Sequence, residues 1–169
     1  MGGGGAGFVV RSAGTGGRNG MIGDASALPE QLVKDAITSA FGSAGQRCSA
    51  ARVLLVQNDI ADKVIRMLAG AMDELRIGDP GVLSTDVGPV IDADALRMLT
   101  DHAARMDREA TLIKQVQLDP STTANGNFFA PRAYELNSLD QLEREVFGPV
   151  LHVIRFDGGK IDALIDTVN

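Results

Sequence analysis

The chain has 169 residues, of which 44 % are hydrophobic and 22 % are charged, as expected of one soluble globular domain or part of one. Its formal net charge is −6 and its aromatic content is 4 %, which argues against nucleic acid as a partner. The sequence shows no signal peptide and no apolar run of membrane length, so we expect a cytoplasmic protein with no membrane partner. The single cysteine excludes an internal disulfide, and we expect no metal site.

The first 18 residues are glycine-rich, and we expect them to be disordered because glycine loses the most backbone entropy on ordering. Gly2, Gly4 and Gly7 match the spacing of a dinucleotide-binding turn. No strand precedes them, so we attribute the match to the glycine run. The folded domain is therefore expected at residues 19–169.

The first regular elements follow this segment. A short strand is predicted at Met21–Ile22, and apolar residues then recur at helical spacing over residues 28–41. Gly42 and Gly45 end this helix. A run of apolar residues next predicts a buried strand at Ala50–Gln57.

The middle of the chain is predicted to be helical. Asn58 or Asp59 is expected to cap a second helix, whose apolar face continues to Leu75. Glycine and proline at residues 78–81 break the pattern. A third helix is predicted over Ala93–Glu109.

The remaining segments alternate strands with a helix. Strands are predicted at residues 111–118, 128–134 and 150–156, and a last helix over residues 160–168. A polar loop at residues 119–127 joins the first two strands. Alternating strands and helices predict an α/β fold, a largely parallel sheet flanked by helices.

Cys48 lies at a glycine-rich junction between a predicted helix and a predicted strand. A turn of this kind can present a nucleophilic sulfur and donate backbone hydrogen bonds to an oxyanion. Arg47 favours the thiolate, although the carboxyl end of the upstream helix acts the other way. The plain alternative is a small buried hydrophobic residue. His102 and His152 are expected to be surface or packing residues rather than partners of the thiol.

Several motifs together resemble the aldehyde dehydrogenase superfamily, and more closely the pyrroline-5-carboxylate (glutamate semialdehyde) dehydrogenase domain of the bifunctional proline utilization A enzymes. The residues that carry this resemblance are Ser39–Phe41, Ser43–Ala50, Leu83–Asp92 and Arg144–Val153. The similarity extends from about residue 15 to the end of the chain. It identifies residues 19–169 as a partial aldehyde dehydrogenase catalytic domain.

The resemblance implies NAD-dependent oxidation of L-glutamate 5-semialdehyde to glutamate in proline catabolism. Cys48 is then the nucleophile, which forms a thiohemiacetal and afterwards a thioester. Arg47 and Ser49 are the substrate-binding residues, and Ser49 resembles the residue that contacts the substrate carboxylate. Glu145 resembles the carboxylate that holds the nicotinamide ribose of NAD, and Phe147 the aromatic residue that packs near that ribose.

The sequence departs from the family at three places. Gly14 stands where the family has a glutamate that acts as the base in thioester hydrolysis, and losing a general base commonly costs about two to four orders of magnitude in rate. The dinucleotide-binding segments that precede this region in the family are not found, and the chain ends before the family's substrate loop and oligomerisation strand. We therefore also expect a truncated fragment.

Three functional readings remain open at this stage. The first is an oxidation module for a small aldehyde substrate, with its missing parts supplied by another chain. The second is a catalytically inactive fragment, at most an interaction module that associates with a full-length relative or with a second copy. The third, a cysteine hydrolase or thiol sensor, is disfavoured because no second cysteine and no neighbouring histidine are present.

Overall fold

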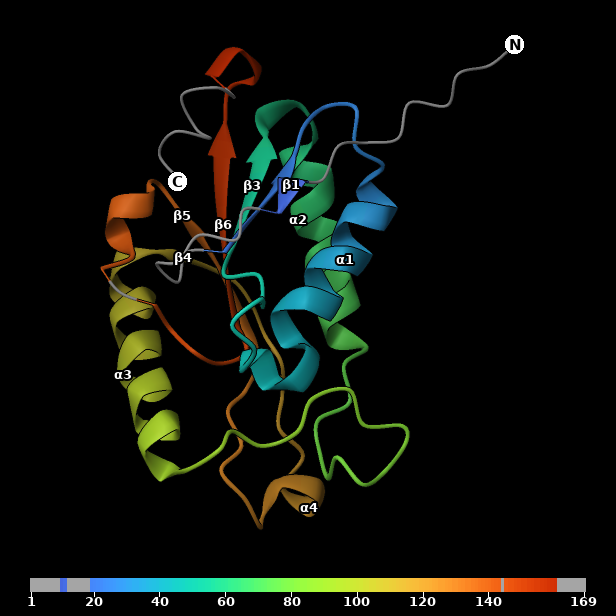
Figure 1. Ribbon diagram of the computed structural model, residues 1–169, viewed down its shortest axis with the longest axis vertical. Helices are drawn as coiled ribbons and strands as arrows, with labels where there is room; N and C mark the ends of the chain where they lie inside the picture. The colour runs from blue at the N-terminus through green and yellow to red at the C-terminus, as the bar shows by residue number, and fades with distance from the viewer. Residues whose placement is uncertain (1–9, 12–18, 144, 161–169) are drawn as a thin grey trace.

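The computed structural model describes residues 10–11, 19–143 and 145–160, which form one six-stranded sheet with helices on both faces (Figure 1). The strands lie in the order β1-β2-β3-β6-β5-β4. The elements are β1 (Val10–Arg11), β2 (Gly20–Gly23), α1 (Pro29–Phe41), η1 (Gly42–Gly45), β3 (Val53–Gln57), α2 (Asn58–Asp73), α3 (Ala93–Glu109), β4 (Thr111–Gln115), α4 (Pro120–Thr123), β5 (Arg132–Leu136), η2 (Leu139–Gln141), β6 (Val150–Phe156) and η3 (Gly158–Lys160).

The centre of the sheet is parallel, which confirms the predicted α/β fold. Strands β2, β3, β6 and β5 run parallel to one another. Strands β1 and β4 pair with β2 and β5 at the two edges in antiparallel orientation. Val53 of β3 lies opposite His152 of β6. Because β3 and β6 are adjacent and parallel, the segments that precede them lie side by side at the amino-terminal ends of these strands.

The core lies on both faces of β3 and β6, whose apolar side chains are almost all buried. Helices α1 and α2 pack against each other on one side of the sheet, and α3 covers the other (Figure 1). Burial on both faces explains why β3 appears as an apolar run and β6 as a mostly apolar one in the sequence.

Helix α3 and strand β6 have the bounds that the sequence predicts. The side chain of Asp92 caps α3 by accepting a hydrogen bond from the Ala95 N–H at 2.7 Å. The other strands differ at their ends. β3 begins at Val53 rather than Ala50, since the N–H groups of both Arg52 and Val53 donate to the Asn19 carbonyl oxygen at 2.9 and 3.2 Å.

Two further boundaries were predicted wrongly. Strand β5 begins at Arg132, because Pro131 has no N–H to donate to a neighbouring strand. Helix α2 has Gln57 at its N-cap and no side-chain capping bond. The Asn58 side chain, one of the two expected caps, donates to Asp157 at 2.6 Å.

The ends of the chain are described only in part. Val10–Arg11, inside the segment expected to be disordered, pairs with β2. Residues 1–9 and 12–18 lie outside the described residues. Of the predicted last helix only Lys160 is described, in η3. None of the helices in the described part of the chain is both long and apolar enough to cross a bilayer.

Candidate functional site

The turn that leads to Cys48 has an unusual backbone. Ser43 and Ala44 have φ angles of 54° and 53°, and Gly45 follows at 64°, so three successive residues adopt the left-handed conformation. Residues other than glycine seldom adopt this region, because Cβ approaches the neighbouring carbonyl. The sequence correctly predicted that a helix ends here, but not this left-handed turn. Strained backbone of this kind occurs at functional sites more often than elsewhere.

This turn touches the segment that carries Glu145 and Phe147. A Cβ atom added to Gly45 would lie 2.1 Å from the Gly148 carbonyl oxygen, and one added to Gly148 would lie 2.3 Å from the Leu99 side chain. Both glycines also have positive φ angles. The two motifs far apart in the sequence therefore meet backbone to backbone, at a place where only glycine fits.

Asn19 holds the Cys48 turn from the side of β2. Its buried side-chain amide donates to the carbonyl oxygen of Cys48 and, at 3.2 Å, to that of Ala50. On the other side, the Ser39 hydroxyl of α1 accepts from the Ala51 N–H at 3.1 Å. The turn is thus fixed by side chains that bond to its backbone.

Arg52 joins the two motifs. Only 3 % of this residue is exposed, and its guanidinium donates to the carbonyl oxygens of Gly45, of Arg47 at 3.2 Å and of Gly148 at 3.2 Å. The guanidinium also lies 4.9 Å from the centre of the Phe147 ring, within the range of a cation–π contact. Burial lowers the pKa of Arg52, and the negative charge of Glu145 acts in the opposite direction.

The three residues predicted to meet the substrate lie together on the surface. Arg47, Cys48 and Ser49 are exposed, and Cys48 is a free thiol. The neighbouring Gln46 joins this turn to the loop after α2, because its side-chain oxygen accepts from the Ile91 N–H at 2.8 Å. The thiol is therefore accessible while its backbone is held in place.

Glu145 and Phe147 line a pocket of about 310 Å³ between α3 and the segment before β6. The pocket also contains Met98, Leu99, Asp101, His102, Arg105, Arg108, Glu143 and Val146. It thus combines a carboxylate that accepts hydrogen bonds with an aromatic ring that is partly exposed. A carboxylate can accept hydrogen bonds from hydroxyl groups, and an aromatic ring can pack against a ring of a ligand.

The two histidines pair at the base of this region. His102 Nε2 lies 2.9 Å from His152 Nε2, and His152 Nδ1 lies 3.0 Å from the Arg52 carbonyl oxygen. A carbonyl only accepts, so His152 Nδ1 carries the hydrogen and Nε2 of the neutral ring accepts from His102. Burial, followed by the neighbouring His102, lowers the pKa of His152 to about 3. Both residues are packing residues, as predicted, and both nitrogen atoms of His152 are used without Cys48.

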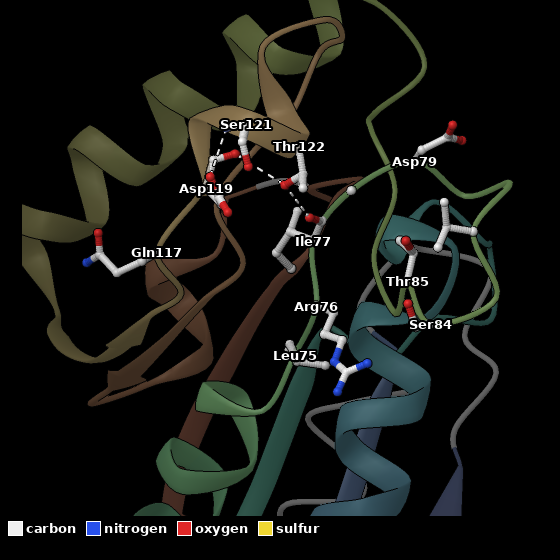
Figure 2. A pocket seen from close by; sticks show the side chains of 12 residues that line it. Leu75, Arg76, Ile77, Asp79, Ser84, Thr85, Gln117, Asp119, Ser121 and Thr122 are labelled. Carbon is white, nitrogen blue, oxygen red and sulfur yellow. Dashed lines mark hydrogen bonds between the residues drawn. The ribbon is translucent and has the colours of Figure 1, made fainter.

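A second pocket, of about 530 Å³, lies away from these residues. Figure 2 shows that its side chains come from the segment after α2, at Leu75–Thr85, and from the segment between β4 and β5, at Gln117–Thr122. Two of its polar groups bond to the backbone: Asp119 accepts from the Ser121 N–H at 2.8 Å within one turn, and Thr122 donates to the Ile77 carbonyl oxygen of the other segment at 3.0 Å. None of the predicted site residues lines this pocket, although it is the larger of the two.

The sequence did not predict the parts played by Asn19, Arg52 and Gln46. Arg52 directly precedes the apolar run of β3, and a charged residue at the start of a buried strand was the available signal. Within the described ranges, no group of three or more His, Cys, Asp or Glu residues could hold a metal ion.

Comparison with known proteins finds relatives that agree with one another. The profile of the aldehyde dehydrogenase family matches residues 7–169. The bifunctional protein PutA of Klebsiella aerogenes is 48 % identical over 159 residues, which cover 92 % of this chain but only 12 % of that protein. A 1-pyrroline-5-carboxylate dehydrogenase of Geobacillus sp. strain WCH70 is 31 % identical over 140 residues, which cover 80 % of this chain and 26 % of that protein.

The fold of a solved relative is also similar. A proline utilization A variant from Bradyrhizobium japonicum has a TM-score of 0.85 and is 48 % identical, over 95 % of this chain and 16 % of that one.

Proposed function

The chain belongs to the aldehyde dehydrogenase family, and we propose that it supplies the cysteine-bearing part of an NAD-dependent oxidation of L-glutamate 5-semialdehyde to glutamate in proline catabolism. The observation that carries this proposal is the contact between the Cys48 turn and the Glu145–Phe147 segment, made through Gly45, Gly148 and Arg52. This contact supports one site that contains both a nucleophile and a ribose-binding carboxylate.

In the proposed reaction, the Cys48 sulfur attacks the aldehyde carbon and the carbonyl electron pair moves to oxygen. The backbone N–H of Cys48 donates to this oxyanion, which stabilises the charge as it develops. Arg47 and Ser49, exposed on either side of Cys48, bind the substrate carboxylate. After oxidation the carbon stays attached to sulfur as a thioester. Attack by water then releases glutamate and returns the thiol.

The residues of the 310 Å³ pocket fit part of NAD. Glu145 would accept hydrogen bonds from the two hydroxyls of the nicotinamide ribose, and Phe147 would pack against that ribose. NAD, when bound, supplies the acceptor for the hydride that leaves the aldehyde carbon. The chain's own part is to hold Glu145 and Phe147 against the Cys48 turn. Arg52 stabilises this arrangement by contacting Gly148 and the Phe147 ring.

The choice of substrate rests on relatives. The name of the Geobacillus relative gives 1-pyrroline-5-carboxylate as its substrate, and the PutA relative is more similar to this chain. Pyrroline-5-carboxylate opens in water to glutamate semialdehyde, whose free carboxylate suits the exposed Arg47. We therefore place this semialdehyde ahead of aldehydes that lack a carboxylate.

The direct test is NADH formation from NAD and glutamate semialdehyde by the purified chain. We expect slow turnover, because Gly14 replaces the base of thioester hydrolysis, and we expect it to require Cys48. Cys48→Ala should abolish it, while Arg97→Ala, which removes an exposed ion pair with Asp94, should keep it. Propionaldehyde serves as the substrate that lacks a carboxylate. Absence of NADH from folded protein whose thiol is still alkylated by iodoacetamide would reject an independent dehydrogenase.

A second candidate function is an interaction module, favoured by large apolar side chains on the surface. Val82, Leu83, Ile91 and Met98 are exposed along the loop after α2 and the start of α3. Apolar side chains gathered in this way are typical of a surface that another protein covers. Sedimentation of the chain alone and mixed with a full-length PutA would test association with a second copy or with that relative. A monomer in both samples would reject it.

A further inference from the structure

Arg52 differs from the other arginines that the structure describes with their partners, because its guanidinium bonds to main-chain carbonyls rather than to carboxylates. The arginines at positions 97, 105, 132 and 155 each form an ion pair with at least one Asp or Glu. The Arg52 side chain instead reaches carbonyl oxygens in two separate turns. A planar guanidinium can donate in several directions at once, which a lysine ammonium on a flexible stem does less well.

The backbone of Arg52 is held as firmly as its side chain. Its N–H donates to the Asn19 carbonyl oxygen at 2.9 Å, and its own carbonyl accepts from the N–H of His152 at 2.9 Å and from the His152 ring at 3.0 Å. The residue is therefore anchored to β2 and to β6. Because the backbone of Arg52 is fixed, its side chain can hold the turns that it contacts in fixed positions.

The two turns have few other direct connections of this kind. Gly45 and Gly148 touch through their backbones, and the guanidinium bonds to the carbonyl oxygens of both. The same group lies over the Phe147 ring and bonds to the carbonyl oxygen of Arg47, the residue before the thiol.

From this geometry we propose that Arg52 is a positioning residue that locks the Cys48 turn to the Glu145–Phe147 segment, so that the two turns order and open as one unit. The inference rests on the proposed function only in taking Cys48 as the nucleophile. It makes Arg52 act through the backbone at Arg47 and Gly148, without contact with substrate. A misplacement of about 1 Å at a nucleophile can cost about a hundredfold in rate.

Amide hydrogen exchange tests the coupling without any need for dehydrogenase activity. In Arg52→Lys we expect exchange to rise together, by about tenfold or more, at residues 46–50 and 145–148, with α3 and β5 unchanged. The matched control is Arg155→Lys, which alters a partly buried arginine of β6 that pairs with Glu135 and Asp62. This control should leave both turns unchanged.

Three results would overturn the proposal: a rise in only one turn, an equal rise across the whole chain, or no rise at all. An equal rise would mean that Arg52 stabilises the fold in general. Phe147→Leu gives a second test, because the side chain is partly exposed and the variant should fold. We expect it to raise exchange at residues 46–50 when Arg52 is present and not when Arg52 is lysine.

A rate measurement that needs no NAD completes the test. Cys48-dependent hydrolysis of p-nitrophenyl acetate should fall about 10- to 100-fold in kcat for Arg52→Lys, with little change in KM. Unchanged kcat would contradict positioning of the thiol. Because this assay omits NAD and the semialdehyde, failure of the dehydrogenase proposal would leave its result intact.

Discussion

The Cys48 turn and the two loops around the larger pocket are both polar segments outside the regular elements, yet they are held in different ways. Exposed Asp119 and Thr122 hold the pocket loops, Asp119 by a bond to Ser121 within one turn and Thr122 by a bond to Ile77 of the other loop. Buried Asn19, just before β2, and buried Arg52, just after the turn, hold the Cys48 turn. Pocket volume alone would favour the loops. Buried polar side chains that bond to the backbone of a surface turn are a better guide to the proposed site than pocket volume.

The strain in the two regions also differs. Among the described residues, Ser43 and Ala44 are the non-glycine residues with positive φ, and both lie in the Cys48 turn. Such strain persists only where the surroundings impose it. The comparison therefore predicts that substitutions which add bulk to the Cys48 turn or remove the side chains that hold it have large effects, and that those in the pocket loops have small ones.

The largest effect is expected at Gly45. Gly45→Ala would place Cβ 2.1 Å from the Gly148 carbonyl oxygen at a φ of 64°, so we expect a loss of about 3 to 5 kcal/mol in the free energy of unfolding. Denaturant titration measures this loss. The control is Gly70→Ala in the last turn of α2, where nothing beyond the helix's own backbone and its chain neighbours lies within 4 Å of the added Cβ, and a gain of about 0.5 to 1 kcal/mol is expected. Equal effects of the two substitutions would refute the close approach.

A smaller loss is expected at Asn19. Asn19→Ala removes the buried amide that donates to the Cys48 and Ala50 carbonyls, and we expect a loss of about 1 to 3 kcal/mol in the free energy of unfolding. Thr122→Ala, which removes an exposed hydroxyl in the pocket loops, should change it by less than about 0.5 kcal/mol. Similar losses in the same titration would remove the distinction between the two regions.

Acid should weaken the fold through His152. Burial, followed by the neighbouring His102, lowers its pKa to about 3 in the folded chain, against 6.5 for a free histidine. Between pH 6.5 and 3, His152 is protonated in the unfolded chain but neutral in the folded chain, so the free energy of unfolding falls as the pH drops. The loss is about 1.4 kcal/mol for each pH unit. Denaturant titrations at several pH values should show a flatter dependence for His152→Gln, and an unchanged dependence would assign it to other groups.

The smallest effect is a gain at Ser43. Ser43→Gly relieves the left-handed strain of an exposed residue, and we expect stability to rise by up to about 1 kcal/mol. A rise in melting temperature of the variant would measure it. A decrease would mean that the serine is not strained in this turn.

The sequence predicted those elements whose signals are local. Helix α3 has an aspartate cap and a regular apolar face, and β6 is a mostly apolar run before an exposed aspartate, so both were predicted to the residue. The boundary of β3 depends instead on Asn19, more than thirty residues earlier, whose carbonyl accepts from both Arg52 and Val53. No local pattern contains that bond.

The candidate site shows the same division. Cys48, Glu145 and Phe147 could be predicted as site residues from their motifs, because the two turns are characteristic in sequence, and these roles stay predictions. The closeness of Gly45 to Gly148 and the pairing of His102 with His152 depend on the order of strands in the sheet. Arg52 was included in a predicted strand because its neighbours are apolar, although its guanidinium turns back to the residues before it.

The most direct test of the central claim is whether NAD at millimolar concentration slows the alkylation of Cys48 by iodoacetamide. If the Cys48 turn and the Glu145–Phe147 segment form one site, NAD should slow labelling in the wild-type chain and lose this effect in Glu145→Ala. The same rate with and without NAD, in a folded chain whose Cys48 is fully labelled, would contradict the account.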